Sequence, residues 1–164
     1  MTTILSIDPS GDPRGDTGIV FIEYTDATPA HALGGWAVQG GIEGFRDWVE
    51  THIDDDEFVW PGTPSAYEPI DTVIVEQFID RQIGGADRSA LLVEGIVRYL
   101  WPDVVLSPAS GKNTAVPDAT LKRLGLYDDD SHHHDVREAS RHAVRWLKNQ
   151  GHIPTLMAGW SKVM

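Results

Sequence analysis

The sequence has no cysteine and no long apolar run, and its first half holds almost no basic residues. Without cysteine there are no disulfide bonds, thiolate metal sites or cysteine nucleophiles, which is typical of a reducing compartment. No run approaches the roughly 18–20 apolar residues of a membrane span, so we expect no membrane association. The chain enters a predicted strand at once, without the basic and apolar segments of a secretory signal, and we therefore expect a cytoplasmic protein.

Charge is distributed unevenly along the chain. Residues 1–80 carry 2 basic and 16 acidic side chains, whereas residues 81–164 carry 11 basic and 9 acidic ones. The net charge of -12 argues at first against a phosphate partner, because phosphate binding needs basic side chains. Any surface that faces a nucleic acid should therefore come mostly from the second half. Solubility explains the acidic excess equally well.

The hydrophobic pattern predicts one α/β domain spanning residues 1–164. A sheet that begins with a hairpin and continues through strand–helix–strand crossovers predicts five strands in a mixed sheet with helices on its faces. The predicted strands are two within residues 3–24, joined by a Gly/Pro/Asp-rich turn, and others at 30–39, 71–78 and 103–108. The predicted helices lie at 41–53, 86–100 and 132–151, with a short one within 109–126; we expect a loop at 54–69 and an irregular tail at 150–164.

Acidic side chains stand where apolar strands end. Asp8 follows the first strand and Glu76 ends the short apolar strand at 71–78. Polar groups at the carboxyl ends of central strands mark ligand sites in sheets of this class. Asp135 and Glu138 lie about one turn apart at the edge of the buried stripe of the last helix. Each acid alone is an ordinary strand or helix terminus, but together the four predict convergence on one point.

Converging carboxylates need a cation, because they repel one another and raise each other's pKa. Carboxylate oxygens are hard ligands that suit Mg²⁺ or Mn²⁺. Two such ions, about 3.5–4 Å apart, can activate a water and stabilise the leaving oxygen of a phosphodiester. The four acids therefore predict a site for two metal ions. A bound metal would also explain why Asp8 can end a buried strand.

Five segments of the sequence resemble, in order, the blocks of RuvC-type Holliday junction resolvases. They are ILSIDPSG…TGIVFI, VIVEQFI, SALLVEGIV, PASGKNTAV and HDVREASRHAV, and they run from residue 3 to about residue 148. The Asp-Pro turn followed by Thr-Gly is shared with other ribonuclease H-like and actin-like proteins. A strand-terminal Glu-Gln before a Ser-Ala helix is more specific to the resolvases.

The resemblance implies a ribonuclease H-like fold and a homodimeric, divalent-metal-dependent endonuclease that cuts four-way DNA junctions. It implies that Asp8, Glu76, Asp135 and Glu138 are the catalytic metal ligands. The chain would be a phage-encoded or otherwise divergent member, acting in the host cytoplasm if phage-encoded. We expect the homodimer to pair partly through the helix at 86–100. The apolar side chains behind this expectation are Leu91, Leu92, Ile96, Val97 and Leu100.

Several basic and aromatic side chains are candidates for catalysis or DNA contact. Lys112 lies in a Gly-containing loop where it could meet the charge that develops on the scissile phosphate, and the resemblance implies a functional lysine in this region. Phe78 would either stack on bases or pack in the core. Arg81 and Arg88 would either clamp phosphates or remain solvated. The candidate phosphate-binding patch consists of Arg81, Arg88, Lys112, Lys122 and Arg123.

The last helix begins with three consecutive histidines and carries basic residues further along. Three adjacent histidines cannot face one point, and no partners at zinc spacing are present. We expect His132 and His133 at a solvated helix start capped by Ser131. His134, one turn before Glu138, stays open as a contact to a metal or a substrate water. On the exposed side of this helix we expect Arg141, Arg145 and Lys148.

Alternative functions remain open on the sequence. One is a related ribonuclease H-like nuclease that cuts flaps, forks or other branched DNA. Another is a junction-binding protein with a degenerate metal site. An actin-like ATP-binding protein is a distant option, since it would need a second phosphate-binding hairpin that we do not find. The sequence has no Gly-x-Ser-x-Gly elbow and no Walker loop.

Overall fold

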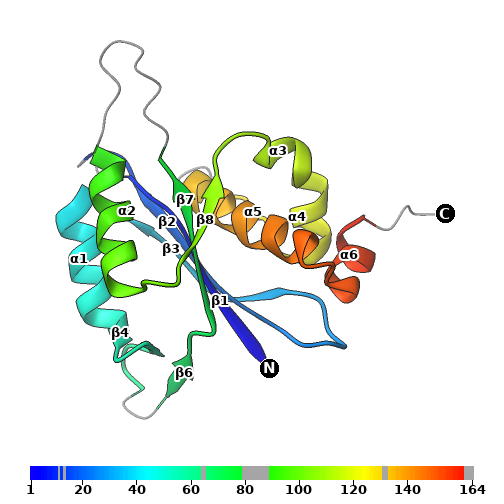
Figure 1. Cartoon of the computed structure of the whole chain (residues 1–164), viewed down its shortest axis with the longest axis horizontal. Helices are drawn as coiled ribbons and strands as arrows, with labels where there is room; N and C mark the ends of the chain where they lie inside the picture. Colours follow the sequence, from blue (N-terminus) through cyan, green and yellow to red (C-terminus); the bar gives the residue numbers. More distant parts are fainter. Residues whose placement is uncertain (11, 13, 64–65, 79–88, 131–132, 161–164) are drawn as a thin grey trace.

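The computed structural model describes residues 1–164 except residues 11, 13, 64–65, 79–88, 131–132 and 161–164. Its centre is a five-stranded mixed sheet with the order β3-β2-β1-β7-β8 (Figure 1). β1 pairs antiparallel with β2 and parallel with β7, and β7 pairs parallel with β8. The predicted α/β class with a five-stranded mixed sheet is confirmed. The strands are β1 (Thr2–Asp8), β2 (Thr17–Tyr24), β3 (His31–Val38), β7 (Thr72–Gln77) and β8 (Val105–Pro108).

Helices cover both faces of this sheet (Figure 1). One face carries α1 and α2, and the other carries α5 with the shorter α3, α4 and α6 beside it. None of the described helices is long and apolar enough to cross a bilayer. The helices are α1 (Gly41–His52), α2 (Ser89–Leu100), α3 (Lys112–Ala115), α4 (Asp118–Leu124), α5 (His134–Asn149) and α6 (Ile153–Trp160).

Strand alternation gives the sheet two hydrophobic cores and decides which way the acids point. In β1, Ile4 packs in the core beneath α5, whereas Leu5 and Ile7 pack in the core beneath α1 and α2. Side chains two residues apart share a face, so Asp8 lies on the α5 side. On β7, Ile74 packs in the core beneath α5, so Glu76, two residues later, also lies on the α5 side. The face that carries both acids is therefore set by the period of the strands.

Helix α5 lies directly against the start of the β1–β2 hairpin. Gly18 is the register partner of Asp8, and a Cβ at Gly18 would overlap the backbone carbonyl of Asp135 at the start of α5. The hydroxyl of Ser6 on β1 donates to the carbonyl of Ala139 at 2.8 Å, in the buried layer between strand and helix. The missing side chain at position 18 thus lets α5 approach Asp8 closely.

Two regions differ from their predicted structure. Residues 54–69, predicted as a loop, include strands of a small antiparallel sheet of order β4-β5-β6. Phe58 on β5 is fully buried and stacks on Phe21 of the main sheet with ring centroids 4.7 Å apart. Strands this short give no readable period, which is why the pattern was missed. The strands are β4 (Ile53–Asp54), β5 (Glu57–Val59) and β6 (Tyr67–Pro69).

The predicted irregular tail at 150–164 is the second difference, because Ile153–Trp160 forms α6. A hydrogen bond to a distant part of the chain anchors this helix, because the backbone N–H of buried Ala30 donates to the Thr155 hydroxyl at 2.9 Å. Tertiary anchoring, rather than its own periodicity, stabilises so short a helix. On α2, Val97 is fully buried in the core instead of lying on the outer surface that the sequence predicted.

We predict that Gly18→Ala destabilises the protein by about 2–3 kcal/mol, because the added methyl must push the α5 backbone off the sheet. Gly35→Ala is the matched control. Its Cβ would lie 2.9 Å from a side-chain methyl of Val136 and at an ordinary 3.7 Å from the carbonyl of Ile19. A side-chain methyl shifts more easily than helix backbone, so about 1 kcal/mol is expected. Denaturant unfolding measures both, and equal losses would contradict the close backbone approach at Gly18.

Candidate metal-binding active site

Three carboxylates meet around one ammonium at the carboxyl ends of β1 and β7. Lys112 Nζ, at the start of α3, lies 2.5 Å from Glu76 Oε2 and 3.1 Å from Glu138 Oε2. It lies 4.0 Å from Asp8 Oδ2. The convergence of Asp8, Glu76 and Glu138 that the sequence predicted is thus present. Lys112, from the predicted loop after β8, stands at its centre.

Hydrogen-bond donors around Glu76 keep it ionised. Burial opposes ionisation, but hydrogen bonds from His142 and Lys112 outweigh it and lower the pKa of Glu76 to about 2. Burial also opposes the charge of Lys112, yet the attraction of Asp8 and the bond to Glu76 raise its pKa. Both groups are therefore charged at neutral pH and form an ion pair.

The surroundings of Asp8, unlike those of Glu76, oppose its ionisation. Burial, and then repulsion from Glu76, raise the pKa of Asp8 well above its usual value despite the nearby Lys112 ammonium. Asp135 and Glu138 add to that repulsion. A carboxyl group kept from ionising by its neighbours gains most from a bound cation. The donor chemistry at this point therefore fits a divalent metal.

His142 is the site residue that sequence reasoning missed. It lies on α5 with no exposed surface, and its Nε2 is 2.7 Å from Glu76 Oε2. Ligand-capable atoms of Asp8, Glu76 and His142 all lie within 4.8 Å of one another, close enough to hold one metal ion together. Burial lowers the pKa of His142 and outweighs the bond to Glu76, so the ring is neutral at pH 7. Its spacing four residues after Glu138 was the available signal, because such residues share a helix face.

A buried ion-pair network holds Glu138 in place. Arg141 Nε donates to Glu138 Oε1 at 2.9 Å, while its other nitrogens reach Asp118 and the carbonyl of Val116. Burial disfavours the charge of Glu138, but the bond from Arg141 and the charge of Lys112 lower its pKa. The expected exposed position of Arg141 is wrong, since only 5% of the residue is exposed. A guanidinium can be buried in this way because carboxylates and a carbonyl accept its hydrogen bonds.

Two further basic residues of α5 hold the segment that carries Lys112. Arg145 Nη1 donates to the carbonyls of Pro108 and Ser110, each at 2.9 Å. Lys148 Nζ donates to the carbonyl of Ala115 at 3.2 Å. Arg145 and Lys148 were expected to be simply solvated. In the structure they fasten the turn around α3 to α5, which fixes where the Lys112 ammonium lies.

Asp135 and His134 lie at the edge of the cluster. Asp135 is close enough for its charge to raise the pKa of Asp8, but it makes no contact with Lys112 among those described. His134 Nδ1 lies 3.4 Å from Asp135 Oδ1, and its Nε2 lies 3.9 Å from Glu138 Oε1. His133 contacts Asp128 at 2.5 Å, so it is paired rather than only solvated.

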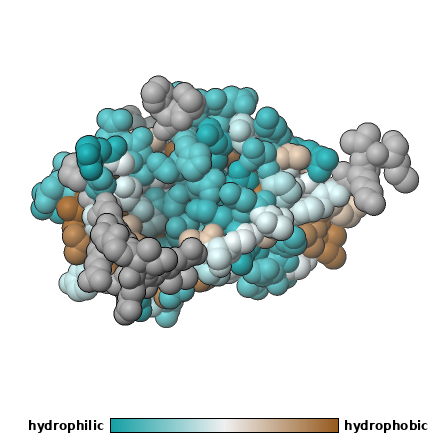
Figure 2. Space-filling view, turned by 90° about the horizontal axis from the view of Figure 1, so that it is seen from above, coloured by the Kyte–Doolittle hydropathy of each residue, from teal (hydrophilic) through white to brown (hydrophobic). Residues whose placement is uncertain are grey.

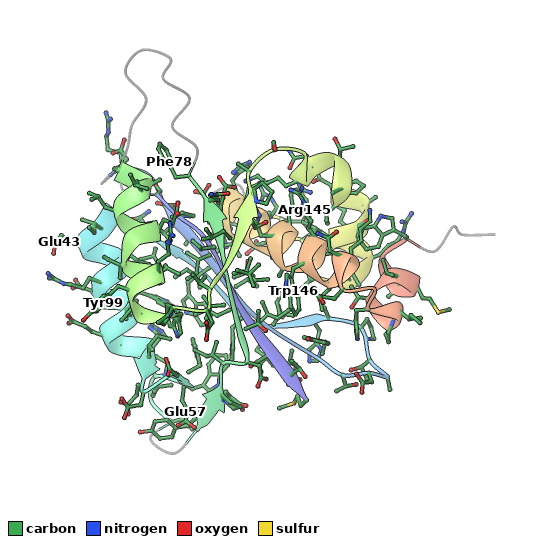
Figure 3. The ribbon with its side chains drawn as sticks, in the orientation of Figure 1. Glu43, Glu57, Phe78, Tyr99, Arg145 and Trp146 are labelled. Atoms are coloured by element: carbon green, nitrogen blue, oxygen red, sulfur yellow. The ribbon has the colours of Figure 1, made fainter. Side chains whose placement is uncertain are left out.

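The predicted DNA-contact residues are less closely grouped. Phe78 lies two residues after Glu76, at the upper end of β7 (Figure 3), and its N–H donates to Glu94. Lys122 lies over the Tyr127 ring at 4.5 Å. Arg123 donates to the carbonyl of Gly159 and lines a depression with Met1, at the opposite end of β1 from Asp8. Arg81 and Arg88, like Ser131 and His132, lie outside the described residues.

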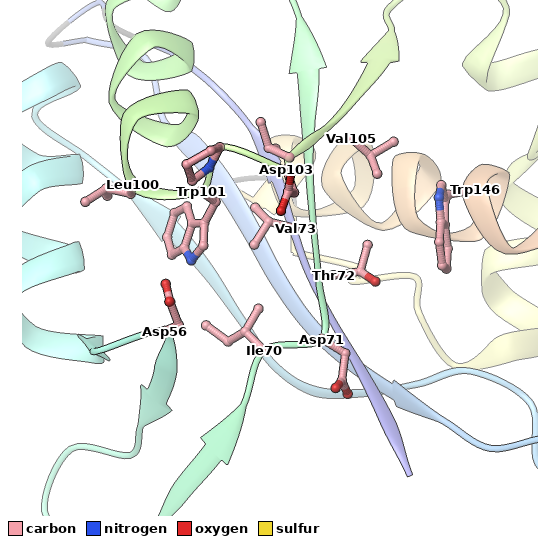
Figure 4. A pocket seen from close by; sticks show the side chains of 12 residues that line it. Asp56, Ile70, Asp71, Thr72, Val73, Leu100, Trp101, Asp103, Val105 and Trp146 are labelled. Carbon is pink, nitrogen blue, oxygen red and sulfur yellow. The ribbon is translucent and has the colours of Figure 1, made fainter.

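Two cavities differ in their relation to the acids. A cavity of about 510 Å³ adjoins the cluster and includes Glu138, Arg141, His134, Arg137 and Asn113 in its lining. The molecule seen from this end is mostly hydrophilic, with apolar atoms mainly at the margins (Figure 2). Another cavity, of about 380 Å³, lies at the far end of β7, where Asp71 and Trp101 contribute to its wall (Figure 4). It is separate from the acidic cluster.

Two solved structures with a similar fold are of RuvC. The first is RuvC of T. thermophilus in complex with Holliday junction substrate, with a TM-score of 0.58, 13% identity and coverage of 92% of this chain and 98% of that one. The second is the Thermus thermophilus RuvC structure, with a TM-score of 0.57, 16% identity and coverage of 92% and 97%. This chain has the RuvC fold. No protein-family model matches its sequence, and no curated protein matches it by sequence.

We predict that Arg141→Met lowers the free energy of unfolding by about 3 kcal/mol, because it removes the guanidinium that Glu138 and Asp118 share and leaves buried Glu138 to pair with Lys112. Arg46→Met is the matched control, since Arg46 pairs with Glu43 at the same helical spacing but is 57% exposed. We expect it to cost about 0.5 kcal/mol or less. Denaturant unfolding of both variants measures the difference, and similar costs would contradict a buried network.

Proposed function

We propose that this protein is a metal-dependent endonuclease that resolves four-way DNA junctions. The observation that carries the proposal is the convergence of Asp8, Glu76 and Glu138 on one point at the carboxyl ends of the central strands. The RuvC fold supports it, and one of the similar structures is of a resolvase bound to a Holliday junction. The proposed ligands of Mg²⁺ or Mn²⁺ are Asp8, Glu76, Asp135 and Glu138, with two ions per site.

The chain's own residues would bind and orient the phosphodiester. Divalent ions, when bound, supply activation of a water and stabilisation of the leaving oxygen. Glu76 and Glu138 are already ionised and held by His142 and Arg141, so they need little reorganisation to bind cations. Lys112 brings a positive charge to the same point, where it can stabilise charge developing on a phosphate oxygen. Phe78, two residues after Glu76, would contact a base beside the cleaved bond.

One observation favours a second candidate. The Lys112 ammonium lies among the carboxylates in the position that a cation would take. An internal ammonium can neutralise the cluster without a metal, as expected of a junction-binding protein with a degenerate site. Cleavage assays on labelled four-way junction, fork, flap and duplex DNA, with and without Mg²⁺, separate the candidates. Cleavage of forks or flaps in preference to junctions would instead favour the broader branched-DNA nuclease.

We predict that Asp8→Asn and Glu76→Gln each abolish Mg²⁺-dependent junction cleavage, while junction binding stays equal or becomes stronger. The reason is that each change removes a metal ligand and also reduces repulsion of phosphate. Asp71→Asn is a suitable control, because Asp71 accepts hydrogen bonds from Thr3 at the other end of the sheet. Gel-based cleavage and binding assays measure both properties. Full activity of Asp8→Asn would exclude the metal site proposed here.

The outer face of α2 supports the proposed homodimer. Leu92 and Tyr99 are 55% and 85% exposed, and Ile96 lies between them on the same helix face. Exposed apolar side chains grouped in this way are typical of interaction surfaces. A two-fold enzyme would place one site on each of two opposed strands of a junction.

We predict that Leu92→Lys converts a dimeric protein into a monomer, because it places a charge in an apolar interface. Met157→Lys is the control, since Met157 is also exposed, at 66%, but lies on α6. Sedimentation velocity at micromolar concentration measures the mass. A monomeric wild-type protein that still cuts junctions symmetrically would refute the dimer.

A further inference from the structure

A serine, a histidine and a glutamate form a buried hydrogen-bonded chain behind the acidic cluster. Glu76 on β7 and Ser107 on β8 are register partners, so both side chains leave the sheet beneath α5. His142 on α5 bridges them, with Nδ1 2.7 Å from Ser107 Oγ and Nε2 2.7 Å from Glu76 Oε2. Ser107 is 7% exposed and His142 is fully buried. Neither group faces a position that a substrate could reach.

Hydrogen-bond chemistry assigns the protons in this chain. Glu76 also accepts from the Lys112 ammonium, so it is a carboxylate, and a carboxylate only accepts hydrogen bonds. The proton in the bond between His142 and Glu76 must therefore sit on Nε2. In the neutral ring Nδ1 is then the acceptor, and the Ser107 hydroxyl donates to it. Ser107 thus selects the ring tautomer that can donate to Glu76.

We infer that His142 is a positioning residue that fixes the Glu76 carboxylate for cation binding, with Ser107 holding the required tautomer. The inference rests on the metal-dependent function proposed above. The bond from His142 reaches Oε2, so Glu76 can offer Oε1 to a cation without breaking it. Partners behind a ligand orient it, and their loss typically weakens metal binding about 10–100-fold. His142 thus holds the Glu76 carboxylate by a hydrogen bond, as Arg141 holds the Glu138 carboxylate.

The competing role for His142 is that of a direct metal ligand, since its Nε2 lies within ligand distance of Asp8 and Glu76. Two observations disfavour it. A ring nitrogen that donates its proton to a carboxylate has no lone pair left for a metal. Mg²⁺ also prefers oxygen ligands, whereas imidazole suits softer ions. The two roles predict different tautomers in the metal-bound protein, because a ligating Nε2 would have to lose its proton.

Two substitutions at position 142 separate donation to Glu76 from contact with Ser107. In His142→Gln the amide nitrogen reaches about as far as Nε2 and can still donate to Glu76. In His142→Asn the shorter side chain reaches only as far as Nδ1, so it can meet Ser107 but not Glu76. The matched control is His52→Asn, because His52 is also a buried histidine but lies on α1 across the sheet.

Isothermal titration with Mg²⁺ in the absence of DNA measures the effect. We expect His142→Asn to weaken Mg²⁺ binding about tenfold or more. We expect His142→Gln to stay within roughly threefold of wild type, since the donor is kept. The control His52→Asn should leave Mg²⁺ binding unchanged. Wild-type affinity in His142→Asn, or an equal loss in His142→Gln, would overturn the inference.

Nitrogen-15 NMR of the wild-type histidine side chains provides a test that needs no folded variant. We expect a proton on His142 Nε2 and none on Nδ1, both before and after Mg²⁺ is added. Loss of the Nε2 proton on adding Mg²⁺ would show direct ligation and overturn the inference. The experiment distinguishes the failure of the positioning role from the failure of the proposed function. A wild-type protein that binds no Mg²⁺ would refute the metal-dependent function and the positioning role together. Mg²⁺ binding that needs Asp8 but not His142 would refute the positioning role alone.

Discussion

The burial of several carboxylates at one end of the sheet is the constraint on which this site depends. Acids removed from water and placed together are unstable unless positive charge or hydrogen-bond donors surround them. Lys112, Arg141 and His142 provide these donors, and Glu76 and Glu138 are ionised as a result. Asp8 receives the least compensation, and its raised pKa marks the point where a cation would be bound most favourably.

Helix α5 meets this constraint because it supplies the acid Glu138 and also the donors to Glu138 and Glu76. Glu138, Arg141 and His142 all lie on it and all point toward the sheet or the turn beside it. Further along, Arg145 fastens the segment before α3, so the position of Lys112 depends on α5 as well. The helix can do this only because the absence of a side chain at Gly18 allows it to approach β1 and β2 closely.

Much of the fold and part of the site could be predicted from local pattern. Strand alternation and strand ends were enough to select Asp8 and Glu76, and helical spacing was enough for Glu138. The short strands β4–β6 and helix α6 were missed because contacts such as the stacking of Phe58, rather than periodicity, stabilise them. Arg141 was wrongly expected on the surface, because a pattern of apolar residues does not show which charged side chains find partners in the interior.

The sequence by itself determined the α/β class, the five main strands and the acids at their ends, since these follow from hydrophobic period and strand termini. Only the tertiary structure decided which donors each acid receives. The bridge from Ser107 through His142 to Glu76 joins residues of three elements, and it depends on the register of β7 with β8 and on how α5 crosses them. Such contacts arise from packing between distant segments, and no local spacing in the chain encodes them.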